Sequence, residues 1–525
     1  MQSQEAVRSE SDSILEAIEV GSADDDHDSE LPDLHDLEKA ATSTTQHTKG
    51  EPAARTLTAQ DWTGPDDPEN PHNWQLWRRN FTLFGIASLA FTVTAGSSMI
   101  TPATFEIAAY YGVSRTASIL SLSLFVLGLG LGPMLAAPLS ETYGRSIVYK
   151  LSGPLYMLFI LGAGFSKNFG GMLVCRLLAG IVGGPVLAVG GGTVADMYTQ
   201  KNRALGSAMF IMSPFLGPAL GPVIGGFAAQ YKGWKWTQWC TIFIALAAYA
   251  FVLPMPETYK KVILKRRAKR HNIPPPPAPA MTTAGYIKLL ITITLARPLV
   301  MLFTEPIVLF FSLYNAFTFS VLFSFFAAYP YTFERVYGFN TWQYGLTFLG
   351  IGVGVILAVV TLILVDRLVY TPLHLQGVKE GKQNIAPEHR LYAAMAGAFG
   401  IPVGLFWFAW TARRSVHWIS PVIAGMPFAW GNAAVFISVA TYLVDVYGPL
   451  NGASALAANG LARYTMGAVF PLFTVQMYST LGIGWATSLL AFVSVAMLPI
   501  PFVFFRFGPK IRDMSKYSMT AQQKK

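Results

Sequence analysis

The stretch GPALGPVIGG, residues 217–226, places four glycines and two prolines in ten residues. It lies inside a long apolar run that otherwise reads as helix, although glycine and proline both weaken a helix interior in water. Gly217, Gly221 and Gly225 recur every four residues and therefore share one helix face. A face without side chains lets a neighbouring backbone approach closely, as small residues do in membranes, and the prolines bend the helix because each removes a backbone donor. The stretch predicts a bent membrane helix whose bare face either packs statically or forms a moving interface.

The composition of the whole chain also indicates a membrane protein. Hydrophobic residues make up 52% of its 525 residues and charged residues 13%, whereas a soluble domain carries about 25% charged residues. A helix needs roughly 20 apolar residues to cross a bilayer, and a segment of this kind must satisfy its own backbone there. Twelve such segments occur, with approximate bounds 82–102, 118–138, 147–165, 171–194, 206–228, 236–254, 299–328, 343–365, 391–411, 418–442, 453–477 and 483–505.

The six-and-six division predicts an all-α membrane protein with twelve transmembrane helices in two pseudo-symmetric bundles, an arrangement typical of internal repeats around a central pathway. The acidic first segment cannot bury a core, so we expect it to be disordered. The expected domains are a disordered cytoplasmic tail (1–75), an N-terminal bundle (76–255), a basic and proline-rich cytoplasmic linker (256–297), a C-terminal bundle (298–506) and a cytoplasmic C-terminal tail (507–525).

The lysines and arginines predict the orientation. Most of the 38 fall in the two tails, the linker and the loops on the same side, and such residues mark cytoplasmic loops. Both termini are therefore expected in the cytoplasm, and the basic surface beside anionic lipid explains the net charge of +9 without a nucleic-acid partner. We expect a monomer in the plasma membrane, with the vacuolar membrane as the alternative. The opposite side holds Arg115, Lys167, Lys232, Lys235, Arg335, Arg413 and Arg414.

Several classes of site are disfavoured by the sequence. It contains no G-x-x-x-x-G-K-[ST] loop, so we expect no ATPase activity. The eight histidines fall outside the predicted spans or at their edges, which disfavours a haem held within the bundle. We therefore expect no enzyme, metal or cofactor, and expect a small-molecule substrate, protons and the lipid bilayer as partners.

The opening stretch resembles the antiporter motif of the major facilitator superfamily, g-x-x-x-G-P-x-x-G-G. CRLLAG, residues 175–180, resembles the fourth-span motif of the same family, and GPMLAAPLSETYGRSIVYK, residues 132–150, resembles its loop between spans two and three. The resemblance implies the fold of that family and an exporter that exchanges its substrate for protons. The residues that match the antiporter motif are Gly217, Pro218, Gly221, Pro222, Gly225 and Gly226.

The loop between spans two and three departs from the general family pattern, since Ala137 replaces a glycine and Ser146 replaces a basic residue. The variant PLSETYGR is instead similar to fungal drug:proton antiporters with twelve spans. DPENPHNW (67–74), PETY (256–259) and EPIVLFFSLYNA (305–316) are similar to the same branch. The resemblance covers about residues 64–510 and is nearest to fungal multidrug, azole and polyamine exporters.

Charged residues at membrane depth are costly and tend to be functional or paired. The resemblance implies a role in proton-linked gating for Arg176, with a structural ion pair or contacts to carbonyls as the alternative. Glu305 is expected near the cytoplasmic third of span seven. A carboxyl group in an apolar site binds a proton more readily, so Glu305 either carries a proton or partners a loop arginine such as Arg297.

Four charged residues occupy similar places at the inner ends of spans two and eight: Glu141, Arg145, Asp366 and Arg367. We expect such pairs to latch the two bundles together when the outward-facing state forms, with solvated surface pairs as the alternative. Asp445 and Arg463 flank spans ten and eleven and could act in the same way.

The substrate pathway is expected to combine aromatic walls with a few polar groups, which suits amphipathic molecules of varied shape. Buried amides need partners, which favours Asn315 and Asn432 over the aromatic residues, each of which could instead face lipid or the core. The candidates are Tyr314, Asn315 and Phe319 in span seven and Trp430, Asn432 and Phe436 in span ten.

The function expected from these observations is proton-coupled export of amphipathic organic compounds such as drugs, azoles, polyamines or secondary metabolites. Two alternatives remain open at this point. The same fold could take up a small organic solute together with protons, or the protein could be a membrane sensor that transports nothing.

Overall fold

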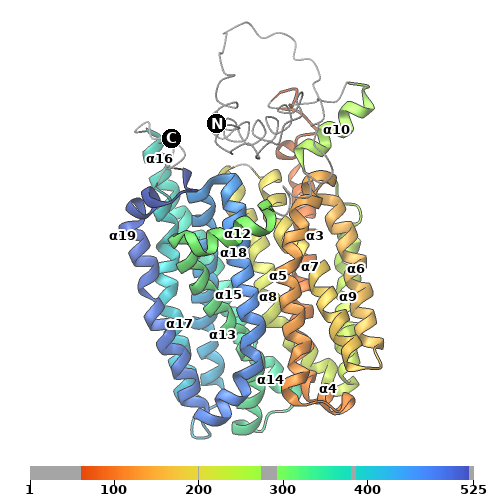
Figure 1. Ribbon diagram of the computed structural model, residues 1–525, viewed down its shortest axis with the longest axis vertical. Helices are drawn as coiled ribbons and strands as arrows, with labels where there is room; N and C mark the ends of the chain where they lie inside the picture. Colours follow the sequence, from red (N-terminus) through yellow and green to blue (C-terminus); the bar gives the residue numbers. More distant parts are fainter. Residues whose placement is uncertain (1–60, 65, 199, 274–291, 380–385, 520–525) are drawn as a thin grey trace, which may run out of the picture.

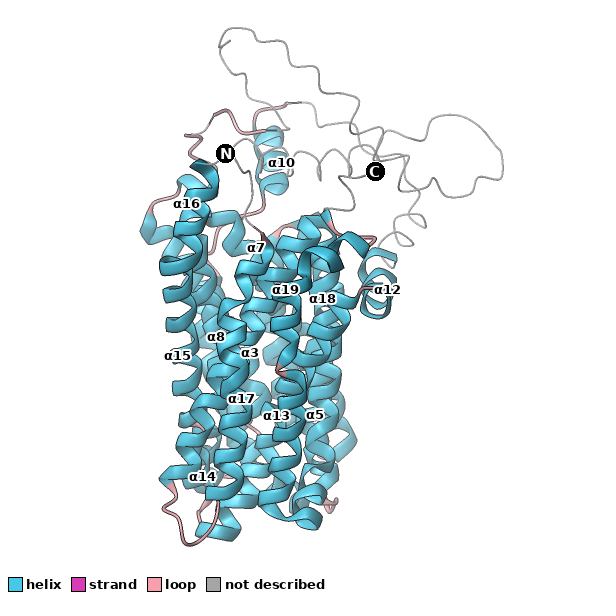
Figure 2. Ribbon diagram, turned by 90° about the vertical axis from the view of Figure 1, so that its left-hand side faces the viewer, coloured by secondary structure: helices cyan, strands magenta, loops and turns pink. Residues whose placement is uncertain are grey.

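The computed structural model describes residues 61–64, 66–198, 200–273, 292–379 and 386–519. These residues form helices and short connections, and no strand occurs among them. Long helices run side by side over the full height of the molecule (Figures 1 and 2). Since a helix satisfies its backbone hydrogen bonds internally, such a bundle suits a hydrocarbon environment.

The first half of the chain supplies six long helices, and the short α4 (Thr104–Tyr111) follows the first of them. Gly112 ends α4 in the left-handed conformation with φ of 64°, which glycine adopts without steric cost. The six long helices are α3 (Leu76–Ser98), α5 (Arg115–Tyr143), α6 (Arg145–Phe165), α7 (Phe169–Met197), α8 (Gln200–Lys232) and α9 (Trp234–Val252).

The second half begins with α12 (Arg297–Thr304) and α13 (Pro306–Tyr337). The long helix α18 (Ile419–Met497) changes direction at Gly448 and Gly482, which have φ of 70° and 77°, and it therefore consists of three legs. The remaining elements are α14 (Thr341–Thr347), α15 (Leu349–Val365), a π-helical turn (Asp366–Tyr370), α16 (Thr371–Lys379), α17 (Tyr392–Thr411) and α19 (Pro499–Met514).

The predicted twelve-helix, two-bundle fold is confirmed. Ten stretches of the described residues are long and apolar enough to cross a membrane, and one of them, 451–514, contains two legs joined at Gly482. The twelfth helix is α9, whose first turns carry the polar residues Lys235 and Gln238. In Figure 1 the first six long helices lie on one side and the last six on the other, with α5 and α8 against α14, α15 and α18.

The two ends of the bundle are distinguished by their short elements. We call one the α10 end, after α10 (Lys260–Arg270), and the other the α14 end. The turn of α16 also lies at the α10 end, while α4 lies at the α14 end (Figure 1).

The chain before α3 differs from the expected disordered tail, because the described structure begins at residue 61 and not at residue 76. Residues 1–60 of that tail lie outside the described residues, but the segment that follows is joined to α10 through Asp61, Asp67 and Glu69. Arg267 of α10 donates two hydrogen bonds to the Asp67 carboxylate, at 2.8 and 2.7 Å, and a third to Glu69 at 2.6 Å. Burial raises the pKa of Asp67, yet the hydrogen bonds from Arg267 and Thr63 hold it well below its usual range. The acidic composition of the whole tail concealed this short paired stretch.

The bare face of α8 packs against α3 within the first half. A Cβ on Gly217 would overlap Thr94 Oγ1, one on Gly221 would lie 2.8 Å from Ala95 O, and one on Gly225 would overlap Met99 O. Real Cβ atoms do not approach backbone atoms this closely, so these positions require glycine. The glycine face is thus a close seam between two helices of one bundle.

The neighbouring face of α8 contacts the second half of the molecule. A Cβ on Gly226 would lie 3.0 Å from Thr341 O, and one on Gly345 would lie 2.6 Å from Pro222 O. Within the motif, Pro222 and Gly226 are therefore the residues that contact the second half, at the α14 end.

We expect Gly225→Ala to lower the melting temperature of the purified protein, because the added methyl group meets only backbone atoms of α3, among them Met99 C at 2.8 Å. Overpacking of this kind costs about 1–3 kcal/mol. Gly191→Ala on α7 is the matched control, since its Cβ would meet nothing within 4 Å. Equal melting temperatures for the two variants would contradict the seam.

Candidate functional site

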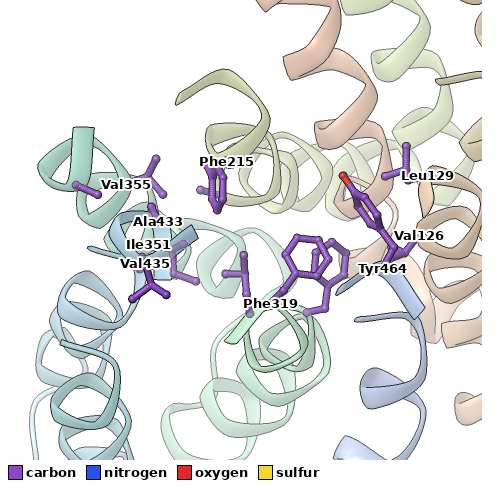
Figure 3. Close-up of a cluster of buried hydrophobic side chains, with 14 of the residues drawn as sticks. Val126, Leu129, Phe215, Phe319, Ile351, Val355, Ala433, Val435 and Tyr464 are labelled. Atoms are coloured by element: carbon purple, nitrogen blue, oxygen red, sulfur yellow. The ribbon is translucent and has the colours of Figure 1, made fainter. Parts of the chain in front are cut away.

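The two halves meet at aromatic side chains midway along the bundle. Phe215 of α8 lies 5.2 Å, between ring centroids, from Phe436 of α18. On the second half, Phe319 of α13 and Tyr464 of α18 are 5.4 Å apart. Figure 3 shows Tyr464 turned toward α5, beside Val126 and Leu129. We call Phe215, Phe319, Phe436 and Tyr464 the central aromatic cluster.

Two of the predicted pathway residues, Phe319 and Phe436, belong to this cluster. Asn315 lies one helical turn from Phe319 and donates from its amide nitrogen to Asn459 at 3.4 Å, while its oxygen has no partner among the described residues. Tyr314 is fully buried, and its hydroxyl is also unpartnered among these residues.

The other two predicted residues behave differently. Asn432 is buried. Trp430 donates from its indole nitrogen to Thr361 of α15 at 3.0 Å and packs over Gly400 of α17. The structure therefore places Trp430 between helices of the second half, apart from the cluster.

Arg463 lies at the central cluster, near the midpoint of the second leg of α18. Its guanidinium carbon is 4.7, 4.4 and 4.5 Å from the ring centroids of Phe319, Phe436 and Tyr464. The interpretation of Arg463 as a latch residue beside Asp445 is wrong, because the helix carries its side chain to the middle of the bundle. Its position inside the eleventh predicted span was the signal for this depth.

Arg176 occupies a different setting, in which each of its three guanidinium nitrogens donates to a carbonyl oxygen and its plane packs 4.3 Å from the Phe125 ring. It donates to Ser121 O of α5 at 3.0 Å and to Gly96 O and Ser97 O of α3 at 2.9 and 3.1 Å. The last carbonyls of a helix lack partners within that helix, so the Arg176 side chain supplies donors where α3 ends. The contacts match the alternative in which Arg176 binds carbonyls and joins three helices.

At the α10 end, Arg145 follows Gly144, which has φ of 101°. The Arg145 side chain pairs with Asp196 at 3.4 Å, and its backbone N–H donates to Glu257 at 2.8 Å. Glu141 is exposed. Arg145 therefore pairs with Asp196 and not with Glu141, the partner expected in the latch hypothesis. The contacts of Arg145 with Asp196 and Glu257 join it to the first half and the PETY segment, and neither reaches the second half.

The corresponding place in the second half is organised by Arg390, which sequence reasoning missed. Arg390 pairs with Asp445 at 2.9 Å and with Asp366 at 3.6 Å, and its guanidinium lies over the ring of Tyr370. Arg367 is exposed, so the expected pairing of Asp366 with its neighbour gives way to pairing with Arg390. Successive residues on a helix point in different directions, which explains the change of partner.

Glu305 lies at the α10 end before α13 and not within that helix, which corrects its expected place inside span seven. Its backbone is extended because it precedes Pro306, and a proline disfavours the helical conformation in the residue before it. Glu305 is 2% exposed. It accepts a hydrogen bond from the Tyr447 hydroxyl at 2.9 Å and another from the Lys516 backbone N–H at 3.1 Å. Arg297 is hydrogen-bonded to Asn451.

Hydrogen bonds between the halves hold the α14 end together. The Tyr344 hydroxyl donates to Pro102 O at 2.9 Å, and the Gln476 side chain donates to Thr116 Oγ1 at 2.7 Å. The Thr341 backbone N–H donates to Gln230 at 3.1 Å. The two halves are therefore closed against each other at the α14 end.

We expect Arg176→Gln to lower the free energy of unfolding by about 3–6 kcal/mol, because the shorter amide can replace at most one of three charge-assisted hydrogen bonds, each worth about 1.5–3 kcal/mol. Arg335→Gln is the matched control, since Arg335 lies at the α14 end and its guanidinium packs 4.3 Å from the Tyr331 ring. Thermal unfolding in detergent measures both. Unchanged stability with lost activity would instead assign Arg176 to gating.

Comparison with known proteins places this geometry in a family. Residues 86–471 match the model of the Major Facilitator Superfamily. "Polyamine transporter 4" of Saccharomyces cerevisiae is 40% identical over 88% of this chain and 74% of its own length. "MFS-type transporter acdC" of Aspergillus candidus is 38% identical over 88% of this chain and 91% of its own length.

A solved structure supports the fold alone. The proton:xylose symporter XylE bound to 6-bromo-6-deoxy-D-glucose superimposes with a TM-score of 0.59 at 15% identity, over 81% of this chain and 95% of that chain.

Proposed function

From the premise that this chain belongs to the major facilitator superfamily, we propose that it exports amphipathic organic compounds from the cytoplasm in exchange for protons. It is a membrane transporter of small molecules rather than an enzyme, and its relatives include fungal transporters of the same family. The exported class, the direction and the coupling to protons are the proposal.

The observation that carries this proposal is the central aromatic cluster, where both halves contribute side chains midway along the bundle. Phe215 comes from the first half, while Phe319, Phe436 and Tyr464 come from the second. Substrate sites of such transporters lie near the midplane between the repeats. Aromatic walls that can repack suit amphipathic molecules of varied shape.

The direction of transport is supported by the charge distribution and by the antiporter-like motif on α8. The α10 end carries the basic helix α10, and clusters of lysine and arginine favour the cytoplasmic side. The α14 end would then face outward, and its closure leaves the central cluster to be reached from the cytoplasm.

Protons are the proposed driving ion because export against a gradient needs a downhill partner and the sequence holds no phosphate-binding loop. Glu305 is the proposed proton carrier. Its carboxylate accepts from Tyr447 and from the Lys516 backbone, so a proton on it would weaken the hold on the segment after α19.

The proposal is tested with the full chain in proteoliposomes whose lumen is more acidic than the medium. We expect an azole, spermidine or an aromatic acid to accumulate inside, since outward proton flow drives inward substrate flow in an antiporter, and we expect a protonophore to abolish the accumulation. Accumulation only when the medium is the acidic side would establish proton symport and contradict export. No transport of any compound would favour the sensor alternative.

We expect Glu305→Gln to reduce proton-driven accumulation of the substrate at least tenfold. Exchange of labelled for unlabelled substrate without a gradient should continue. Glu388→Gln is the matched control, because Glu388 is 4% exposed at the same end and pairs with Arg512 at 3.0 Å. The control should lose thermal stability and keep its coupling. Full proton-driven accumulation by the Glu305 variant would remove Glu305 from the mechanism.

The sensor alternative and the location are tested in cells. Removal of residues 1–60 should leave export intact in a transporter and should remove the output of a sensor that signals through its tail. We place the protein in the plasma membrane with both termini in the cytoplasm and the vacuolar membrane as the alternative, and a fluorescent fusion separates the two membranes.

A further inference from the structure

Arg463 holds a positive charge in the middle of the bundle, and its surroundings differ from those of Arg176, which lies nearer the α14 end, where α3 ends. Arg176 is 0% exposed and donates to three carbonyl oxygens. The Nε of Arg463 is buried without a hydrogen-bond partner among the described residues, and its side chain as a whole is partly exposed. The rings beside its guanidinium come from α13 and α18, so the charged group lies inside the bundle at the central aromatic cluster.

No carboxylate of the described residues forms an ion pair with Arg463. The carboxylates between residues 76 and 519 of the described chain lie at helix ends or in connections: Glu141, Asp196, Glu257, Glu305, Asp366, Glu388, Asp445 and Asp513 at the α10 end, and Glu106 and Glu334 at the α14 end. The middle of the bundle therefore carries the charge of Arg463 without a compensating negative charge from these residues.

The aromatic rings stabilise this charge incompletely. A guanidinium over a ring is attracted by the negative ring face, and three rings lie 4.4–4.7 Å from the Arg463 guanidinium carbon. The Arg463 side chain is hydrogen-bonded to Tyr464, while its Nε has no partner among the described residues, so the Nε side of the guanidinium keeps its capacity to donate. The planar fork of arginine matches a carboxylate with two parallel hydrogen bonds.

We propose that Arg463 binds the anionic group of the substrate, and that the protein prefers organic anions with an aromatic part over cations. This inference rests on the proposed function and specifies its substrate class. The anion pairs with the guanidinium edge while its aromatic part packs against Phe319, Phe436 and Tyr464. A polyamine would instead bring positive charge to a centre that already holds one, and like charges in a poorly solvated site repel strongly.

A polar approach to Arg463 lies on the α10 side of it. Asn459 and Asn315 are each one helical turn nearer the α10 end than Arg463 and Phe319, and they are hydrogen-bonded to each other at 3.4 Å. The unpartnered oxygen of Asn315 can accept a hydrogen bond from a hydroxyl or amide of the same substrate. The two asparagines thus extend the site toward the end proposed to face the cytoplasm.

The test compares binding of three labelled probes to the purified full chain in lipid nanodiscs: 2-naphthoic acid, its neutral amide 2-naphthamide, and spermidine. For the unmodified protein we expect 2-naphthoic acid to bind at least tenfold more tightly than the other two. Arg463→Gln should bring the affinity for the acid to within twofold of the affinity for the amide. Arg463→Lys should keep only part of the preference, because a lysine lacks the planar fork.

Matched measurements keep the outcomes separate. Arg335→Gln, which removes an arginine stacked on Tyr331 at the α14 end, should keep the full preference for the acid, and melting temperatures show whether each variant is folded. A folded Arg463→Gln variant that still prefers the acid tenfold, or an unmodified protein that binds spermidine most tightly, overturns the inference. If Arg463→Gln does not fold, the Arg463→Lys variant decides, and an undiminished preference in it counts against the inference.

Failure of the proposed function gives a different result from failure of this inference. Selective binding of the acid without proton-driven transport of any probe would leave the role of Arg463 standing and contradict the exporter. Proton-driven export restricted to the amide or spermidine would support the exporter and contradict the role of Arg463.

Discussion

Close contact between helix backbones is the constraint on which the rest of this structure depends. Lipid tails are as apolar as leucine side chains, so helices in a membrane gain little from hiding apolar surface and depend on tight packing. A Cβ on Gly180 would overlap Phe125 O of α5, and one on Gly132 would overlap Ile181 O of α7. The second half repeats this packing between α15 and α18, where a Cβ on Gly350 or Gly354 would overlap a backbone carbonyl oxygen. These seams hold the helices of each half closely against one another.

The polar contacts are distributed differently at the two ends of the bundle. The pairs formed by Arg145 with Asp196 and by Arg390 with Asp445 lie at the α10 end of their own halves. The bonds from Tyr344 to Pro102 and from Gln476 to Thr116 instead cross between the halves at the α14 end. Opening the α14 end would break these crossing bonds and leave the glycine seams intact.

Two arginines show that the same residue type at membrane depth can do opposite things. Arg176 is satisfied by carbonyl oxygens where α3 ends, so its charge joins three helices. Arg463 is surrounded by aromatic rings with its Nε unpartnered among the described residues. A satisfied charge stabilises the resting structure, whereas an unsatisfied one remains available to a ligand. The sequence shows both as charges within spans and cannot tell which is which.

Hydropathy and local motifs predict the membrane class, the twelve helices, the division into two halves and the family, because both are properties of contiguous segments. The partners of each motif residue were decided only in three dimensions. The repeat of Gly217, Gly221 and Gly225 predicts a bare face, yet only the tertiary structure shows that α3 of the same half covers it. Glu305 leaves its helix because of Pro306, a local effect, but its partners Tyr447 and Lys516 come from distant segments. A pairing between residues far apart in the chain depends on how all the intervening helices pack, and no local pattern records that packing.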